Sequence, residues 1–388
     1  MCSIIKLIDS LLTHAHACGA SDIHIHPRRD IISVRFRVDG SLLVAHQIPN
    51  ATHAEVISRL KVLAGLRTDE HQIAQDGRFR FALPNDTWLD VRISIAPTYH
   101  GENAVLRLLS GELCSRNLSD LGFSPSDQSM LTRSVNKQNG MVLITGPAGS
   151  GKTTTLYALL TILAKKSLSI VTIEDPIEYS IEGVTQIQTN KRSGLTFAEG
   201  LRSILRQDPD IIMVGEIRDH ETASLAVNAA LTGHMVLSTL HTRSAIGSIP
   251  RLFDLKVDPY LLASTLSLVV GQRLARKICS ACKKKDVTST ELFEESEYST
   301  KNQGEKKAFY KGAGCSVCNN GAYRGRIGIY ELLAIDEDMR EGIGRKLSTN
   351  ELRVRAEKKG MVGIDSQALT KAHGGIISLE ELLRIRQE

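Results

Sequence analysis

The chain has 388 residues, of which 42% are hydrophobic, 23% charged and 4% aromatic, and its formal net charge is +5. This composition is ordinary for a folded globular protein and excludes global disorder, while the length predicts two or three domains. The charge is slight and no dense Lys/Arg block occurs, so composition gives only weak support for a nucleic-acid or anionic-membrane partner.

The first segment, MCSIIKLIDSLLTHAHACGASD, predicts an amphipathic helix and not a signal peptide, because Lys6 and Asp9 interrupt its apolar residues and no small-residue cleavage site follows. One face of that helix carries Ile4, Ile8, Leu11 and Ala15. No window of the sequence reaches the roughly 18 uncharged apolar residues of a membrane span. We therefore expect a cytosolic chain that does not insert into a membrane.

Residues 1–109 predict an N-terminal α+β domain. Apolar and polar residues alternate in segments between Asp-Gly and Pro turns, which is typical of strands, and a helix is expected near 54–66. The strand segments are 21–27, 31–48, 76–83, 88–97 and 104–109. Residues 110–127 are richer in Ser and Gly and predict a linker.

From residue 128 the pattern changes to short apolar runs that alternate with helices. Unalternating runs such as 211–214 suit strands buried on both faces, so we expect a mostly parallel sheet covered by helices in residues 128–274. Residues 275–388 are expected to form a C-terminal region with paired cysteines and a mainly helical tail. Capping-box spacing predicts the start of two tail helices, at Ser348 with Glu351 and at Ser378 with Glu381.

The stretch MVLITGPAGSGKTTTLYALL predicts a strand, a loop and a helix in order, and it fits G-x-x-x-x-G-K-[ST] without a gap. The glycines allow backbone N–H groups to wrap phosphates at the positive end of the helix. Lys152 is expected to reach the β- and γ-phosphates and Thr153 to hold Mg²⁺. The sequence thus predicts a site for a nucleoside triphosphate, ATP with Mg²⁺, made by Gly146, Pro147, Ala148, Gly149, Ser150, Gly151, Lys152, Thr153 and Thr154.

Hydrolysis needs an acidic residue beside the phosphates. The buried run 211–214 ends at Gly215 and delivers Glu216 to the sheet edge where phosphates bind. Glu216 is therefore a candidate to hold Mg²⁺ through water or to orient the attacking water. His234 precedes the next predicted strand and His241 follows it. From the residues alone, a γ-phosphate sensor and an ordinary polar role both stay open for these histidines.

Cysteines form two C-x-x-C pairs, Cys279 with Cys282 and Cys315 with Cys318. Each pair places two thiolates on one turn, and two such turns complete the tetrahedral shell of four sulfurs that Zn²⁺ prefers. Disulfides are not expected in the cytosol. Because four thiolates leave no open coordination position, the predicted zinc site is structural.

Seven segments together resemble the secretion ATPases of bacterial type II secretion and type IV pilus systems, and they occur in that family's order. They are RFRVDGSL, QDGRF, RISIAPTYHGENAVLRLL, GPAGSGKTTTLYALL, TIEDPIE, LRQDPDIIMVGEIRD and TGHMVLSTLHT. The stretch from Leu205 to Asp219 resembles the family's signature. We therefore expect an α/β fold with a RecA-like P-loop NTPase core, a smaller N-terminal α+β domain and a C-terminal zinc-bearing, mainly helical region.

The resemblance implies roles for residues that match the family's motifs. Lys152 and Thr153 would bind phosphate and metal, and Glu216 would be the Walker B acid. His234 and His241 match the histidine box.

Within TIEDPIEYS, Glu174 and Glu178 match the so-called aspartate box, and the resemblance places the general base at Glu178. Asp175 is expected to be a turn residue, because Pro176 restricts it to extended geometry and ends the strand.

Arg92 and Arg107 match family arginines that reach the γ-phosphate across the interdomain cleft. A guanidinium suits that role because it stabilises delocalised developing charge. On the sequence alone both arginines sit in predicted strands, where a solvated or ion-paired role is the alternative.

The resemblance further implies a homo-hexamer that hydrolyses ATP to rotate an inner-membrane platform protein and extrude pilin subunits. Such a motor would be cytoplasmic and peripheral at the cytoplasmic face of the inner membrane. In that family the tetracysteine module marks assembly ATPases, which favours extrusion over retraction. The chain begins at the arginine-bearing domain, where assembly ATPases usually carry a further domain. The sequence therefore does not identify the docking partner, and a competence-type system with a short ATPase is a further candidate.

Other function classes stay open. Retraction of a pilus is the alternative within the family. A nucleic-acid motor shares the core fold, but the low aromatic content and near-balanced charge argue against a basic channel with stacking aromatics, so no nucleic-acid partner is expected. A third class is a regulatory switch that binds ATP without turnover.

Overall fold

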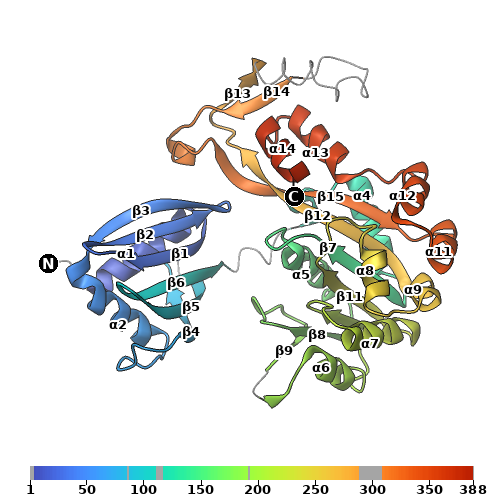
Figure 1. The fold of residues 1–388 in the computed structure, drawn as a ribbon, viewed down its shortest axis with the longest axis horizontal. Helices are drawn as coiled ribbons and strands as arrows, with labels where there is room; N and C mark the ends of the chain where they lie inside the picture. Colours follow the sequence, from blue (N-terminus) through green and yellow to red (C-terminus); the bar gives the residue numbers. More distant parts are fainter. Residues whose placement is uncertain (1–3, 85–86, 111–116, 191–192, 288–307, 388) are drawn as a thin grey trace. The chain divides into compact units, whose positions relative to one another are not determined.

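The computed structural model describes residues 4–84, 87–110, 117–190, 193–287 and 308–387. The chain divides into two compact units, Met1–Leu113 and Cys114–Glu388, coloured from blue to cyan and from cyan to red in Figure 1. Each unit has its own sheet and its own core, so the two are described separately.

The N-terminal unit is built on a six-stranded sheet in the order β3-β2-β1-β6-β5-β4. All neighbouring strands pair antiparallel. The strands are β1 (Ala20–Pro27), β2 (Ile31–Val38), β3 (Ser41–Pro49), β4 (Gln75–Ala82), β5 (Trp88–Thr98) and β6 (Gly101–Ser110). The predicted strands of this unit are thus present.

Two helices supply the core partner of that sheet, α1 (Ile4–Ala17) and α2 (His53–Leu63), the latter preceded by the 3-10 turn η1 (Asn50–Thr52). Alternation along the strands sends one set of side chains into a core shared with both helices. From α1 that core takes Ile8, Leu11, Leu12 and Ala15, as the amphipathic pattern predicts. The opposite set of strand side chains includes the arginines discussed below.

The C-terminal unit is built on a seven-stranded sheet in the order β15-β12-β7-β11-β10-β8-β9 (Figure 1). All pairings are parallel except that of β12 with β15. The strands are β7 (Gly140–Thr145), β8 (Ile170–Glu174), β9 (Thr185–Gln188), β10 (Ile211–Val214), β11 (Met235–Leu240), β12 (Leu266–Ile278) and β15 (Tyr323–Ala334). The predicted α/β core with a mostly parallel sheet is confirmed.

Helices cover both faces of this sheet and form two buried clusters, which gives three layers. One face packs against α3 (Leu118–Leu121), α4 (Pro125–Val135) and α5 (Lys152–Leu163). The other packs against α6 (Phe197–Ile204), α7 (His220–Leu231), α8 (Ser248–Asp254), α9 (Pro259–Thr265), α11 (Glu337–Gly344) and α12 (Thr349–Lys358). The strands β7, β8, β10 and β11 are buried on both faces, which is why their sequences do not alternate.

Part of the predicted linker 110–127 is helical instead. Residues 111–116 lie outside the described residues, but α3 and the start of α4 follow, and Leu118, Leu121 and Phe123 enter the core. The polar residues that suggested a linker act as helix caps, since Ser124 accepts from the N–H of Asp127 at 3.2 Å. Local composition does not distinguish a cap from a linker.

The expected boundary at residue 275 falls inside β12, and β15 from the C-terminal region completes the core sheet. Beyond the sheet stand the hairpin of β13 (Lys283–Asp286) and β14 (Phe309–Gly312), the 3-10 turn η4 (Ser316–Cys318), and the helices α13 (Ile364–His373) and α14 (Leu379–Gln387). Both helices share a small core with Phe309 and with Ala275 of β12.

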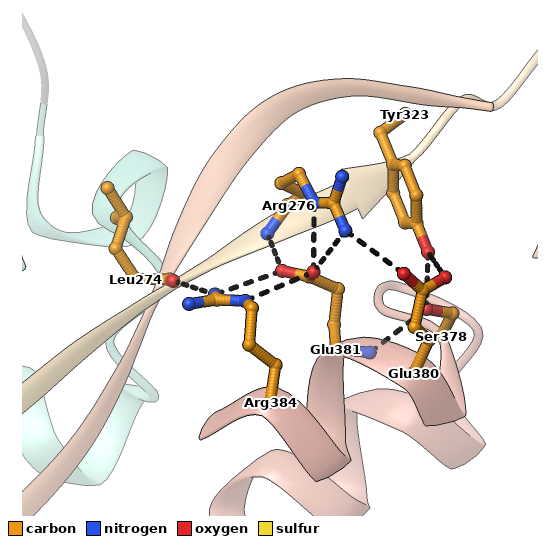
Figure 2. A network of polar contacts seen from close by, with 7 residues as sticks. All are labelled: Leu274, Arg276, Tyr323, Ser378, Glu380, Glu381 and Arg384. Atoms are coloured by element: carbon orange, nitrogen blue, oxygen red, sulfur yellow. Dashed lines mark hydrogen bonds and ion pairs between the residues drawn. The ribbon is translucent and has the colours of Figure 1, made fainter. Parts of the chain in front are cut away.

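The two predicted capping boxes differ in the structure. Ser348 and Glu351 make both hydrogen bonds at the start of α12. Ser378 accepts the N–H of Glu381 at 3.2 Å, but the Glu381 carboxylate accepts from Arg276 and Arg384 (Figure 2). Among the described residues, no helix combines the length and apolar character that crossing a membrane requires.

Candidate active site

The loop between β7 and α5 has the geometry of a phosphate cradle. Gly146, Gly149 and Gly151 adopt positive φ angles of 153°, 76° and 86°, which residues with a Cβ rarely adopt. A Cβ at Gly146 would lie 2.3 Å from the carbonyl oxygen of Gln272 and 2.6 Å from Ser150 Oγ. The backbone of the loop therefore requires glycine at this position, and α5 begins directly after the loop at Lys152.

Lys152 is buried at the base of this loop. Its Nζ donates to the carbonyl oxygens of Gly146 and Pro147, both at 2.9 Å. Burial lowers the pKa of Lys152 from 10.5 to about 8; the Glu216 carboxylate opposes this shift and the Arg273 guanidinium adds to it. A partly desolvated ammonium at this position suits a phosphate group, which would replace the two carbonyl oxygens.

Two hydroxyl groups of the loop also suit the binding of a phosphate group and its metal ion. Ser150 Oγ is buried and makes no hydrogen bond within the part of the chain that the structure describes. Thr153 is exposed at the start of α5 and lines the cavity described next, whereas Thr154 is half-buried. The donor set and the glycine cradle thus fit a polyphosphate with a metal at Thr153.

A cavity of about 220 Å³ opens beside the loop, at the carboxyl ends of β8, β10 and β11. Parallel strands end at one edge of the sheet, and this edge is where such folds bind ligands. Predicted site residues that line the cavity are Ala148, Gly149, Lys152, Thr153, Glu174, Glu178, Glu216 and His241. Asp175, Pro176 and Thr239 also line it.

Glu216 follows β10 and Gly215, with 13% of its side chain exposed. Its Oε1 forms an ion pair with Arg218, and its Oε2 lies 3.2 Å from Nε2 of His241. The hydrogen bond from Arg218 to Glu216 raises the pKa of Arg218, although burial opposes the shift. Glu216 and His241 therefore lie within hydrogen-bonding distance of each other on the lining of the cavity.

Glu174, the last residue of β8, is buried, and its carboxylate accepts three hydrogen bonds. Oε2 accepts from the Tyr157 hydroxyl, and Oε1 accepts from Thr172 Oγ1 at 2.6 Å and from Gln186 Nε2 at 3.1 Å. Glu178 lies four residues later, half-buried, in the loop that follows. β8 ends at Glu174 as predicted, and Asp175 is exposed in the turn.

His234 does not enter this cavity. It directly precedes β11, and its carbonyl oxygen accepts from the N–H of Gly140 at the start of β7, whereas the phosphate loop follows the end of β7. The length of a six-residue strand, about 20 Å, separates the two ends. The Nδ1 atom of His234 lies 3.0 Å from the Ala229 carbonyl oxygen. Within this chain the two histidines thus lie at opposite ends of β11, which a motif in the sequence does not reveal.

Arg92 and Arg107 lie in the N-terminal unit, directly opposite each other on β5 and β6. The Nε of Arg107 donates to Oδ1 of Asp22 at 3.1 Å, and Arg37 forms an ion pair with Oδ2 at 3.6 Å. The register continues the row across five strands as Arg37, Asp22, Arg107, Arg92 and Arg78. The ion-paired alternative therefore applies to Arg107 in this structure, and 60% of its side chain is exposed.

Four cysteines gather beside the hairpin β13–β14. The Sγ atoms of Cys279, Cys282, Cys315 and Cys318 all lie within 4.8 Å of one another. Measured separations are 3.9 Å for Cys279 to Cys315, 3.8 Å for Cys282 to Cys318 and 3.7 Å for Cys315 to Cys318. A tetrahedral zinc site with Zn–S bonds of about 2.3 Å requires sulfur atoms about 3.8 Å apart. The cluster fits that metal.

Sequence reasoning missed three residues that shape the site. Gln272 of β12 donates to the Ser150 carbonyl oxygen at 2.7 Å and accepts from Thr155 Oγ1 at 2.9 Å, so it braces the loop. Arg218 pairs with Glu216 across the irregular segment that follows β10. Tyr157 binds Glu174. No local pattern identifies Gln272, because its partners lie more than 100 residues away in the chain.

Comparison with known proteins agrees with this geometry. The family model described as Type II/IV secretion system protein matches residues 1–384. The Type II secretion system protein E of Pseudomonas aeruginosa is 44% identical over 99% of this chain and 76% of that protein. The Type IV pilus assembly ATPase PilB of Myxococcus xanthus is 40% identical over 98% of this chain and 67% of that protein.

Among solved structures, the pilus retraction motor PilT with bound ADP superposes with a TM-score of 0.65 at 25% identity, over 97% of this chain and 96% of that one. The family match spans both units, including the arginine-bearing sheet and the cysteine cluster. The chain therefore belongs to the Type II/IV secretion system protein family and is a secretion ATPase.

Proposed function

We propose that this chain is the ATPase motor of a system that assembles a pilus or pseudopilus, in type II secretion, type IV pilus formation or competence. The observation that carries the proposal is the cavity in which Lys152, Thr153, Glu178 and Glu216 meet at the carboxyl edge of a parallel sheet. Names of relatives at 40 to 44% identity, type II secretion protein E and pilus assembly ATPase, support the same class.

In this proposal the phosphate loop, residues 146–154, binds ATP. Lys152 leaves the carbonyl oxygens of Gly146 and Pro147 and binds the phosphates, and the loop N–H groups hold the remaining oxygens. Thr153 and Glu216 would hold Mg²⁺, which would neutralise charge on the phosphate oxygens. His241 keeps Glu216 oriented.

Glu178 is the general base that takes the proton of the attacking water, and Glu174 is the reserve candidate for that role. Both carboxylates line the cavity, but Glu174 already accepts three hydrogen bonds. A role for Arg92 and Arg107 at the γ-phosphate rests on the family resemblance. His234 lies outside the cavity and is given no role at the γ-phosphate. The four cysteines hold a structural Zn²⁺.

The proposed assembly is a homo-hexamer at the cytoplasmic face of the inner membrane, where it works on a platform membrane protein without entering the bilayer. The arginine-bearing domain is the N-terminal unit, and the zinc-bearing region begins in β12, whose pairing with β15 belongs to the ATPase core. These statements rest on the family resemblance. Light scattering on the Mg-ATP-bound chain should give six times the subunit mass of 42.5 kDa.

Steady-state phosphate release tests the enzyme assignment. The Lys152→Ala variant should lose ATP binding, and Glu178→Gln should bind Mg-ATP normally while turnover falls at least about 100-fold, the scale of a lost general base. Glu182→Gln is the matched control, since Glu182 is an exposed carboxylate of the same loop outside the cavity lining. Turnover that persists in Lys152→Ala would contradict the site.

Retraction is the second candidate, because the PilT motor shares the fold over nearly the whole chain. Deleting the gene distinguishes an assembly motor from a retraction motor. Loss of an assembly motor leaves the cell without pili or pseudopili, whereas loss of a retraction motor leaves excess pili. Electron microscopy of the deletion strain and of a strain carrying Glu178→Gln gives the answer.

A further inference from the structure

Tyr157 connects the helix after the phosphate loop to both glutamates of TIEDPIEYS. It is fully buried in α5, four residues after Thr153. Its hydroxyl group donates to Oε2 of Glu174 and accepts the backbone N–H of Glu178 at 3.1 Å. One oxygen atom thus joins three segments: the helix that carries Thr153, the end of β8 and the loop that carries Glu178.

A second side chain holds the same loop from its other end. Gln186 of β9 donates from Nε2 to Oε1 of Glu174 and to the carbonyl oxygen of Tyr179, both at 3.1 Å. Its Oε1 accepts the N–H of Ile181 at 2.8 Å. Tyr157 and Gln186 therefore bind the main chain at Glu178, Tyr179 and Ile181, and both use Glu174 as their common acceptor.

Glu174 is occupied as an acceptor by this arrangement. Its two oxygens receive Tyr157, Thr172 and Gln186, and only 3% of the residue is exposed. Three of the roughly four acceptor positions of this buried carboxylate are therefore filled, which leaves little of it for an attacking water. The geometry suits a fixed anchor better than a base.

We propose that Tyr157 is a positioning residue for ATP hydrolysis, which acts with Gln186 through the Glu174 anchor to hold the main chain of Glu178 at the cavity. The inference rests on the proposed function, in which Glu178 is the base. Residues four apart on a helix share one face, so Thr153 and Tyr157 join the metal site to the base through one rigid turn. Burial, and then the nearby Glu174 charge, raises the pKa of Tyr157 far above its usual value, so the hydroxyl keeps its proton.

Replacing Tyr157 with Phe removes the hydroxyl and leaves the ring. Because a misplacement of about 1 Å can cost about 100-fold in rate, we expect kcat of Tyr157→Phe to fall between about 10-fold and 100-fold. The KM and the Kd for Mg-ATP should change less than about twofold, since phosphate binding is untouched. If Tyr157 were purely structural, its replacement would lower the melting temperature but would not lower kcat while leaving the Kd unchanged.

Tyr330→Phe is the matched control. Tyr330 is also buried in the same unit. Its hydroxyl group donates to the carbonyl oxygen of Leu121 at 3.0 Å and contacts Thr155, neither of which lines the cavity. Both variants lose one buried hydroxyl, so their melting temperatures should fall by similar amounts. If kcat of Tyr157→Phe falls no more than that of Tyr330→Phe, the inference is wrong.

A double variant separates this inference from the proposed function. If Tyr157 acts only through Glu178, then Tyr157→Phe combined with Glu178→Gln should be no slower than Glu178→Gln alone. Multiplicative losses would mean that Tyr157 acts elsewhere and would overturn the inference. Normal turnover in Glu178→Gln would instead reject Glu178 as the general base. The ATPase assignment itself would then be decided by whether Lys152→Ala loses ATP binding and turnover.

Gln186→Met supplies a second variant, because Gln186 is half-buried on the edge strand and its loss threatens the fold less than the loss of a core residue. It should lower kcat without changing the Kd, as Tyr157→Phe does. Glu174→Gln should resemble these two variants. A Glu174→Gln variant that is as inactive as Glu178→Gln, with Gln186→Met unaffected, would make Glu174 the base and reject the anchor.

Discussion

The carboxylate of Glu381 accepts both the backbone N–H of Arg276, at 2.7 Å, and its Nε, at 2.8 Å (Figure 2). Arg384 of α14 adds two more hydrogen bonds, from Nε to Glu381 Oε1 at 3.2 Å and from Nη2 to Oε2 at 3.1 Å, and also donates to the carbonyl oxygen of Leu274. Glu381 is fully buried, so these contacts replace water. They fasten α14 to β12 three residues before Cys279, which links the C-terminal helix to the cysteine cluster.

Glu381→Gln should lower the free energy of unfolding of the C-terminal unit. Removing one charge from a buried pair leaves the two arginines with incomplete partners, which we expect to cost about 2 kcal/mol because both guanidiniums are partly hydrated. Urea unfolding followed by circular dichroism measures the change. Glu380→Gln is the control. That neighbouring carboxylate is exposed, so its loss should change the free energy of unfolding by less than about 0.5 kcal/mol.

The ion pairs of Glu381 also predict that the stability of the C-terminal unit depends on pH in the acidic range. Burial by itself raises the pKa of Glu381, but hydrogen bonds from Arg384 and Arg276 outweigh it and hold the pKa below 4.5. A lowered carboxyl pKa stabilises the fold above the unfolded-state value and loses that effect as pH falls through the folded-state value. The stability gap between wild type and Glu381→Gln should therefore be constant above pH 4.5 and close below it. A gap that widens on acidification would contradict the ion pair.

Lys152 predicts proton uptake when nucleotide binds. The free protein holds this lysine at a pKa of about 8, and phosphates beside it should return the pKa toward 10.5. Near pH 9 the complex should therefore bind about one more proton than the free protein, and near pH 7 almost none. Above pH 8 the affinity for Mg-ATP should fall by up to about tenfold per pH unit.

Calorimetry in buffers of different ionisation enthalpy measures that uptake. Lys371→Met is the control, because burial also lowers the pKa of Lys371 but this residue bonds the Gly122 carbonyl oxygen outside the cavity lining. The Lys371→Met variant should still take up a proton when nucleotide binds at pH 9. Equal enthalpies in all buffers at pH 9 would mean that Lys152 does not change protonation.

Gly146 and Gly149 should respond differently to alanine. At Gly146 the new Cβ would meet a backbone carbonyl at 2.3 Å, whereas at Gly149 it meets no described atom within 4 Å and only the positive φ opposes it. We expect Gly149→Ala to cost about 1 kcal/mol and Gly146→Ala about 3 kcal/mol or more, with loss of nucleotide binding. Thermal unfolding without nucleotide measures both. Equal costs would contradict the close approach of Gln272.

The cysteine cluster predicts one tightly held zinc ion per chain. Cys279→Ser should lose the metal and lower the melting temperature, because structural zinc contributes about 10 kcal/mol or more to small isolated modules. Elemental analysis and thermal unfolding measure the two effects. Cys18→Ser is the control, since Cys18 belongs to the N-terminal unit and is not one of the four clustered cysteines. A zinc content that is the same in both variants would reject the site.

Local patterns of the sequence determined the order and type of most elements. Alternation marked the strands of the N-terminal unit, unalternating runs marked β7, β8, β10 and β11, and glycine spacing marked the phosphate loop. These signals are local because side-chain periodicity and turn chemistry act over a few residues. The cysteine pairs likewise predicted a cluster, since each pair lies on a single turn.

Contacts between distant strands were decided only by the tertiary structure. Gln272 reaches the phosphate loop because β12 pairs with β7, and His234 misses the cavity because parallel strands place their two ends at opposite edges. The three carboxylates of TIEDPIEYS look alike in sequence, yet Tyr157 and Gln186 both donate to Glu174 in the structure. Strand order and side-chain packing assign such roles, and neither is written in the spacing of residues along the chain.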